Sequence, residues 1–290
     1  MLWLLACAVD DFEALEPPEA GAQLHVEAFE VPAFSEVERC WWLTADNAAG
    51  FVTSMELKAR PGLHHAVVYR TEASSSGVED CFGLPEAAME DWHDVPQPLF
   101  ASSTQVNEQV VDFPEGVGVE LEADARLLVN VHYLNVTGEP LQAEVYVNLV
   151  VEDAVQTPAQ LYAMGNLYDV QIPAQSEVAL TTSCPIEVPF TPLSMTPHMH
   201  RLGTSFQVEQ GGVELFSQSG WHPETVWFEE PQPLEVGTLE FTCRWENPTD
   251  EDVHFGPGAE DEMCFVFGWA TGLDDMYWQA NYSGCEAVSG

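Results

Sequence analysis

Basic side chains are almost missing from this sequence. Of its 290 residues only 7 are Lys or Arg, against 48 Asp or Glu, which gives a formal net charge of −41. Binding to DNA or RNA depends on clustered Lys and Arg, so the shortage excludes a nucleic-acid partner. Hydrophobic residues make up 46% of the chain and aromatic residues 11%, far more than a disordered acidic segment contains. The sequence therefore describes a folded, anionic protein whose length predicts about two domains.

Long apolar runs are also missing, and the sequence predicts no transmembrane helix. The first seven residues, MLWLLAC, place a small residue before Cys7 and resemble a bacterial lipobox, in which the cysteine is lipidated. This apolar segment is short and no basic residue precedes it, so a truncated start and a chance cysteine are the alternatives. We hypothesise that residues 1–22 form a truncated signal with a lipidated Cys7 as membrane anchor, followed by an acidic tether.

Cysteines with metal-type CxxC spacing are absent. An even number remains besides Cys7, which favours disulfides and an extracytoplasmic location, whether secreted, periplasmic or lipid-anchored. These cysteines are Cys40, Cys81, Cys184, Cys243, Cys264 and Cys285. Spacing alone does not choose among the pairings. The triplet at 135–137 (NVT) is a formal glycosylation sequon, which means little if the lipobox marks a bacterial host.

Helical patterns are sparse, and 85–92 (PEAAMEDW) is the best candidate helix. Short runs rich in β-branched and aromatic residues recur between Pro, Gly, Asn and Asp, which predicts an all-β chain built from sandwiches. These runs are 51–57, 127–134, 143–151, 178–182, 204–209 and 264–269. A polar segment at 152–160 predicts a boundary near residue 155, which separates domains at 23–155 and 156–290. No internal repeat of 20 to 50 residues is visible.

Histidines fall into three compact pieces on predicted strands: LHHAVVY at 63–69, VNVHY at 129–133 and PHMHRLG at 197–203. His198 and His200 are two residues apart, so on a strand both imidazoles project from one face. His64 and His65 are adjacent and would point to opposite faces, so a bulge or twist is needed before both reach one ion. A lone strand histidine is usually a surface or core residue, but the grouping favours a metal site.

Met263 lies beside a cysteine in DEMC at 261–264. A thioether is a soft ligand and imidazole suits copper, so His, His and Met together indicate copper that cycles through Cu(I).

With these pieces in order, the chain from 40 to 285 resembles the copper type II, ascorbate-dependent monooxygenases, the family of peptidylglycine α-hydroxylating monooxygenase and dopamine β-monooxygenase. The HH pair resembles the family's HHM motif, with Ala66 in place of methionine. FPEGVGVEL at 113–121 and LVNVHY at 128–133 resemble the segments that lead to its third histidine. HMHRLG at 198–203 is similar to HxHxxG, and DEMC is similar to the segment with the methionine ligand.

The resemblance implies two consecutive jelly-roll β-sandwich domains and two copper ions per chain. His64, His65 and His132 would hold an electron-transfer copper, and His198, His200 and Met263 would hold the catalytic, oxygen-activating copper. The implied disulfides are Cys40 with Cys81, Cys184 with Cys285, and Cys243 with Cys264. The implied reaction is hydroxylation of a substrate C–H bond by dioxygen, with ascorbate or another one-electron donor as reductant.

Two departures from the family bear on the substrate. Peptide-hydroxylating members carry an arginine two residues before HxH that grips the peptide carboxylate, and Thr196 stands there in this chain. A tyrosine of that subfamily is also absent, since FVF follows Cys264. We therefore expect an amine-bearing or neutral aromatic small molecule. The alternatives are a non-catalytic copper-binding sandwich and a surface interaction protein whose histidines are structural.

Overall fold

The computed structural model describes residues 12–46, 48–73, 75–81, 96–102, 105–221, 225–256, 258, 260–274, 277–279 and 284–288. Cys7 and the candidate helix at 85–92 lie outside these residues. The described part consists of strands and connecting loops without a helix, which confirms the prediction of an all-β sandwich fold. It follows that none of the described residues belong to a helix that could span a membrane.

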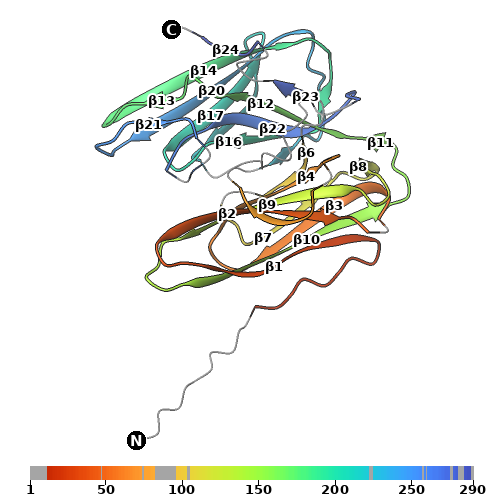
Figure 1. Cartoon of the computed structure of the whole chain (residues 1–290). Coiled ribbons are helices and arrows are strands. Elements are labelled where there is room, and N and C mark those ends of the chain that lie inside the picture. Colours follow the sequence, from red (N-terminus) through yellow and green to blue (C-terminus); the bar gives the residue numbers. More distant parts are fainter. Residues whose placement is uncertain are drawn as a thin grey trace, which may run out of the picture.

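The first ten strands form two sheets packed face to face, shown in red to green in Figure 1. One sheet has the order β1-β10-β3-β8 with β7 beside β3, and the other has the order β5-β2-β9-β4-β6. The strands are β1 (Gly21–Val31), β2 (Ser35–Thr44), β3 (Gly50–Ala59), β4 (Leu63–Arg70), β5 (Gly77–Asp80), β6 (Gln97–Ala101), β7 (Glu108–Asp112), β8 (Val117–Leu121), β9 (Arg126–Asn135) and β10 (Leu141–Glu152).

The later strands form a second sandwich. Its sheets have the orders β19-β16-β22-β12-β23, with β15 beside β22, and β18-β17-β20-β14-β24, and β13 pairs with β21. The strands are β12 (Gln160–Asn166), β13 (Gln171–Ile172), β14 (Ser176–Ile186), β15 (Thr191–Pro192), β16 (Ser194–His198), β17 (Gly203–Gln210), β18 (Val213–Ser219), β19 (Val226–Trp227), β20 (Gly237–Asn247), β21 (Val253–His254), β22 (Cys264–Thr271), β23 (Tyr277–Gln279) and β24 (Glu286–Ala287). Each run named as a strand from the sequence lies within one of these elements.

Strand β9 shows how alternation separates core from site. Leu127, Val129, Val131 and Tyr133 belong to the core between the two sheets of the first sandwich. The intervening residues therefore point to the outer face of their sheet, and His132 is among them. All of these side chains are buried, and Leu128 packs on that outer face with Cys40 and Trp42. Figure 1 shows β4 and β9 lying toward β16 and β22.

The junction between the sandwiches is packed with aromatic rings. After β10, the short strand β11 (Thr157–Pro158) pairs in parallel with β8 of the first sandwich. The ring of Phe113 lies 5.5 Å from that of Trp227 and 4.9 Å from that of Trp269. Trp269 and Leu193, from the second sandwich, belong to the core cluster of the first. The predicted boundary near residue 155 lies between β10 and β11, where this junction begins.

Three disulfides are present, and they are the pairs that the resemblance implies. They join Cys40 to Cys81, Cys184 to Cys285, and Cys243 to Cys264. Disulfides of this number fit an extracellular or otherwise oxidising location.

The described part of the predicted acidic tether before β1 lies against the first sandwich. The guanidinium of Arg60 lies 4.4 Å from the centre of the Phe12 ring. The side chains of Gln23 and Asn148 donate hydrogen bonds to the carbonyls of Leu15 and Glu16. Polar side chains on β1 and β10 thus hold the segment by its backbone, an attachment that its acidic composition does not reveal.

Candidate metal centre

A β-bulge at the start of β4 places two adjacent histidines on one side of the sheet. Leu63 pairs with Tyr133 and His65 pairs with His132, so His64 is the extra residue between two regular pairs. In an unbroken strand His64 would share the inward face of Ala66 and Val68, which lie in the core. The bulge removes that constraint, and it is the irregularity that two adjacent ligands require.

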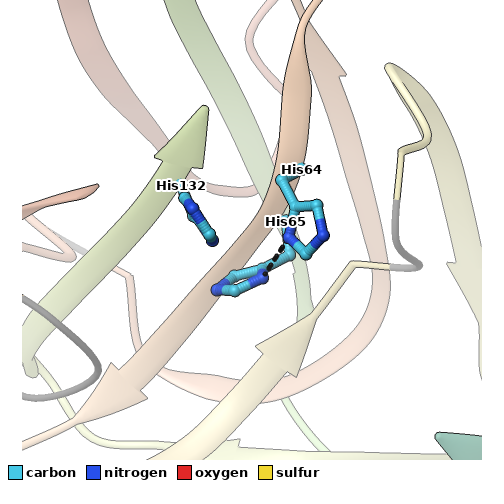
Figure 2. A group of neighbouring side chains, drawn as sticks. All are labelled: His64, His65 and His132. Carbon is cyan, nitrogen blue, oxygen red and sulfur yellow. Dashed lines mark hydrogen bonds between the residues drawn. The ribbon is translucent and has the colours of Figure 1, made fainter. Parts of the chain in front are cut away.

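His64, His65 and His132 converge as Figure 2 shows, and one nitrogen atom from each lies within 4.8 Å of the other two. The Nδ1 atoms of His64 and His65 are 3.2 Å apart. Metal–imidazole bonds measure about 2 Å, so two nitrogens at this separation can bind the same ion. His64 and His132 are buried, which keeps water away from the ring nitrogens. The donor set suits copper or another metal that accepts imidazole.

His132 is positioned by an acidic neighbour on β2. A carboxylate oxygen of Glu36 lies 2.5 Å from Nε2 of His132. Within the described part of the chain neither ring nitrogen of His132 makes a hydrogen bond of regular geometry, although the ring is fully buried. A carboxylate beside Nε2 favours the tautomer that carries its proton there, which leaves Nδ1 for an ion. Buried ring nitrogens without regular partners are what a ligand position provides.

The protonation states of these histidines also suit metal binding. Burial, together with the nearby His132 and His200, lowers the pKa of His64 to about 4. Burial likewise lowers the pKa of His132 to about 4 and holds the pKa of His65 well below its usual range. Only the neutral imidazole has a free electron pair for an ion. All three rings therefore stay ready to bind a metal in mildly acidic solution.

The second histidine set lies on the outer face of the opposing sheet. His198 ends β16, where it pairs with Phe265 of β22. Met263 precedes β22 by one residue and is half-buried. Burial lowers the pKa of His198 to about 3. His200 lies beyond the end of β16, so the predicted strand does not extend across the HxH pair, but the rings of His198 and His200 are neighbours at 5.2 Å.

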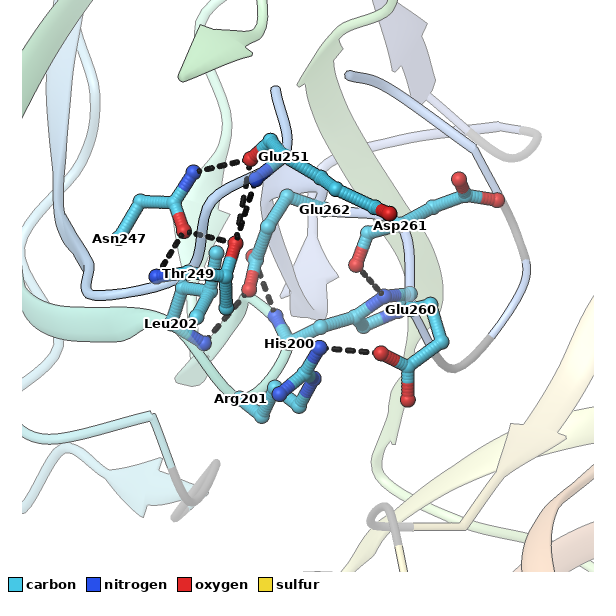
Figure 3. A network of polar contacts seen from close by, with 9 residues as sticks. All are labelled: His200, Arg201, Leu202, Asn247, Thr249, Glu251, Glu260, Asp261 and Glu262. Atoms are coloured by element: carbon cyan, nitrogen blue, oxygen red, sulfur yellow. Dashed lines mark hydrogen bonds and ion pairs between the residues drawn. The ribbon is translucent and has the colours of Figure 1, made fainter. Parts of the chain in front are cut away.

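His200 is held by the segment that carries Met263, as Figure 3 shows. Its Nδ1 donates a hydrogen bond of 2.8 Å to the carbonyl oxygen of Asp261, which leaves Nε2 for an ion. The fully buried carboxylate of Glu262 accepts hydrogen bonds from the backbone N–H groups of His200 and Leu202, at 2.8 and 2.7 Å. The indole N–H of Trp245 donates to the same carboxylate at 2.9 Å. Glu262, which directly precedes Met263 in the sequence, therefore holds the HxH loop next to the segment that carries this methionine.

Each ligating imidazole is expected to have a hydrogen-bond acceptor for its other ring nitrogen, but the sequence does not identify three acceptor groups of the site. Glu36 and Glu262 are two of 48 acidic residues, and nothing in their spacing marks them. The Asp261 carbonyl is a backbone group that any residue offers. One signal was readable in principle, because Glu262 directly precedes Met263. The structure shows why a carboxylate is needed there, since three N–H donors meet at it.

Comparisons with known proteins add little. No family model matches the chain, and no curated protein matches its sequence. Among solved structures the chain is similar to a peptide-N(4)-(N-acetyl-β-D-glucosaminyl) asparagine amidase. The identity is 8% and the TM-score is 0.39, over 91% of this chain and 100% of that chain. A likeness at this level carries no argument about activity.

Proposed function

We propose that this protein is a copper-dependent monooxygenase that hydroxylates a C–H bond of a small molecule. The observation that carries the proposal is the convergence of His64, His65 and His132 into one imidazole cluster. Two of these residues are consecutive on one strand, and His132 comes from another strand. The pairing of His198 with the strand after Met263, and the hold of Glu262 on His200, support a second set of mixed His and Met ligands. Sulfur beside imidazole favours copper among the biological metals.

Copper bound at the two sets would supply one-electron redox chemistry and the activation of dioxygen. The overall reaction consumes R–H, O₂, two electrons and two protons, and it yields R–OH and water. Ascorbate or another one-electron donor of the extracytoplasmic space would provide the electrons. Burial lowers the pKa values of His64, His65, His132 and His198 and so keeps these imidazoles neutral. Glu36 and the Asp261 carbonyl fix the tautomers of His132 and His200. Lipidation of Cys7 would attach the enzyme to the cell envelope.

The substrate proposed for this site carries an amine or a neutral aromatic group. Thr196 lies two residues before His198 on the same face, and its hydroxyl is hydrogen-bonded to that of Thr225 at 2.8 Å. Phe267 packs beside His198, with its ring 5.6 Å away, and stacks with Phe265. Among these neighbours no cation is available to bind a substrate carboxylate. The strong negative charge of the chain also attracts cations and repels carboxylates.

Ascorbate-driven oxygen consumption by the copper-loaded protein tests the proposal. We expect turnover with a phenethylamine that exceeds turnover with a hippurate-like acid, and loss of turnover in Met263→Ala. Faster oxidation of the acid would overturn the substrate class. Copper binding without product-coupled oxygen consumption across amine, aromatic and peptide substrates would instead identify a non-catalytic copper-binding protein.

A further inference from the structure

The two most exposed large apolar residues in the described part of the chain lie together at one corner of the first sandwich. Phe34, in the turn between β1 and β2, is 76% exposed, and Val136, in the turn between β9 and β10, is 71% exposed. The backbone N–H of Phe34 donates a hydrogen bond of 3.0 Å to the carbonyl of Thr137, so the two turns adjoin. Single exposed apolar residues are ordinary, but Phe34 and Val136 together form an apolar tip.

The backbone conformation of Phe34 makes phenylalanine an unfavourable residue for this turn. Its φ is 49°, in the left-handed region that bulky residues rarely adopt. Burial does not offset this strain, because most of the residue is exposed to solvent. Neither local conformation nor packing therefore accounts for an aromatic side chain at this corner.

The corresponding corner of the second sandwich carries a residue that stabilises the turn. Gln175 takes the place of Phe34, and its backbone N–H donates to the carbonyl of Thr249 at 3.1 Å. Its side-chain amide donates further hydrogen bonds to the carbonyls of Pro248 and Thr249, at 2.6 and 3.0 Å. A phenyl ring makes no such bonds, so the first sandwich lacks contacts that the second one has.

The two corners also differ in charge. In the second sandwich the turn after Asn247 reads PTDED at 248–252, with three acidic residues. In the first sandwich the turn after Asn135 reads VTGEP at 136–140, with one acidic residue, and the adjoining turn at 31–35 (VPAFS) has no charge. The chain as a whole has a net charge of −41, so a nearly uncharged apolar tip is an exception on its surface. Exposed apolar side chains with little charge around them suit contact with lipid.

The chain that precedes β1 runs toward the same end of the first sandwich. The carbonyl of Glu16 accepts a hydrogen bond from Asn148 of β10, and the ring of Phe12 lies under Arg60, whose backbone N–H donates to the carbonyl at position 144 of β10. From Glu16 back to Phe12 the segment therefore advances along β10 toward residue 141, where the turn of the apolar tip ends. Cys7 is five residues before Phe12, and an extended chain of that length spans at most about 18 Å.

We propose that the apolar tip of Phe34 and Val136 inserts into the surface of an electrically neutral lipid bilayer, beside the lipid-bearing N-terminus. This inference rests on the envelope attachment proposed above and is independent of the copper chemistry. A second contact limits the orientations of a chain that is otherwise held only by its N-terminus. An anionic bilayer is a poor partner, because it repels the negative charge of the chain.

The proposed contact has a consequence for the candidate metal centre. Figure 1 shows the segment before β1 on the side of the first sandwich that is turned away from the second sandwich. This segment lies on the sheet of β1, β10 and β3, whereas His65 and His132 belong to the other sheet. A bilayer at the tip and the N-terminal segment therefore leaves the second sandwich and the histidines on the side away from the lipid.

Energy transfer from the tryptophans of the full chain to a dansyl-labelled lipid measures binding to phosphatidylcholine vesicles at equilibrium. Phe34→Gln introduces the residue type that the second sandwich has at its corner, so we expect the variant to fold, and its urea midpoint checks this. We expect Phe34→Gln to lower the partition into the vesicles about tenfold, and Val136→Ser to lower it about threefold. Vesicles rich in phosphatidylglycerol should bind the wild type more weakly than phosphatidylcholine vesicles do.

Val236→Ser is the matched control for the two substitutions at the tip. Val236 belongs to the second sandwich and is 65% exposed, so its replacement removes a comparable apolar surface away from the tip. Its partition should equal that of the wild type. Every variant keeps the apolar residues before Cys7, so binding through the N-terminal segment cancels in these comparisons.

The outcomes separate this inference from the proposed function. Equal partition of the wild type and Phe34→Gln, or no binding of either, would overturn the lipid contact. Sedimentation that shows a dimer for the wild type and a monomer for Phe34→Gln would also overturn it, because the tip would then bind a second copy of the chain. Tighter binding to phosphatidylglycerol would overturn the neutral lipid class. None of these measurements involves copper, so ascorbate-driven oxygen consumption decides the proposed function separately.

Discussion

The two sandwiches of this chain have the same framework and carry their candidate metal-binding residues on different parts of it. Each sandwich contains a chain corner in which a residue of positive φ precedes a serine. This residue is Phe34 in the first domain and Gln175 in the second. The serine hydroxyl donates to a proline carbonyl at 2.7 Å in both. Each corner serine pairs with an asparagine at the end of a central strand, Asn135 or Asn247.

The asparagines make corresponding contacts as well. The amide of Asn135 donates to the carbonyl of Glu139 at 2.9 Å, and that of Asn247 donates to the carbonyl of Glu251 at the same distance. Both side chains are 1% exposed. The segments VPAFSEV at 31–37 and IPAQSEV at 172–178 show this relationship in the sequence, at a separation far longer than a short repeat unit. We infer that the domains are copies of one structural unit.

Even the bulge that unites the first histidine set has its counterpart. In the first domain the register shifts between Leu63 and His65, opposite Tyr133 and His132. In the second it shifts between Gly203 and Ser205, opposite Trp245 and Arg244. His64 and His65 correspond to Thr204 and Ser205, whose side chains are not imidazoles. The bulge therefore belongs to the framework of both sandwiches, and only in the first domain does it carry histidines.

The second domain places its ligands on the other sheet, where β16 and β22 face the first domain. The Glu262 contact holds this set together, so its loss is the largest change we predict. Glu262→Ala leaves three buried N–H donors without their acceptor, which should lower the free energy of unfolding by about 3 kcal/mol. The copper affinity of the His198 set should fall about 100-fold, and that of the His64 set should change far less.

Urea unfolding and competitive copper titration measure these effects. Glu262→Gln, which keeps the shape, should show smaller losses. Glu260→Gln is the control on the same loop, because Glu260 forms an exposed ion pair with Arg201 whose loss should cost under about 1 kcal/mol. Equal weakening of both sets by Glu262→Ala would show that the carboxylate does not act through the second set.

The second prediction concerns acid sensitivity, to which the buried His64 of the first set should contribute. The folded-state pKa of His64 is lowered to about 4, whereas an unfolded histidine titrates near 6.5. As the pH falls below about 6.5 the unfolded chain binds a proton that the folded chain does not. Stability of the metal-free protein should therefore decline between pH 6.5 and pH 4, by about 3 kcal/mol from His64 alone.

Urea midpoints measured between pH 6.5 and pH 4 give the dependence of stability on pH. His64→Gln should reduce this pH dependence by the share of His64, and Thr204→Ala, at the corresponding bulge of the second domain, should leave it as in the wild type. A slope that is the same in His64→Gln and in the wild type would assign the acid sensitivity to other groups.

The smallest predicted effect comes from Glu36, the carboxylate beside His132. Glu36→Gln keeps the size of the side chain but removes its charge, so copper affinity of the first set should fall about tenfold. The matched control is Glu177→Gln, because Glu177 follows the corner serine of the second domain as Glu36 follows that of the first. Competitive copper titration of both variants tests the difference, and equal affinities in the two would remove Glu36 from the site.

Much of the fold was readable because strands and disulfides leave local or pairwise signals. The alternation in LLVNVHYL predicted the strand that carries His132, and β-branched runs predicted its neighbours. The HxH spacing predicts that His198 and His200 are neighbours, as their rings are, although the strand ends at His198. The bulge at His64 was recognised as a requirement but could not be derived, because it depends on pairing with β9 rather than on local sequence.

Other parts of the site depend on packing between distant segments. The positions of Glu36 and Glu262 follow from tertiary register, and single carboxylates in an acidic chain give no pattern. The meeting of the two histidine sets follows from how Phe113 seats against the second sandwich. Neither histidine motif alone predicts how far apart the two sets lie.

The burial of Trp269 and Leu193 in the core of the first sandwich has a consequence for how the protein is made. The half synthesised first lacks two of its own core side chains until the last third of the chain has left the ribosome. Its apolar surface around Phe113 then stays uncovered during translation. The first half is therefore expected to depend on chaperones until the second half arrives, and halves produced separately should associate through this surface.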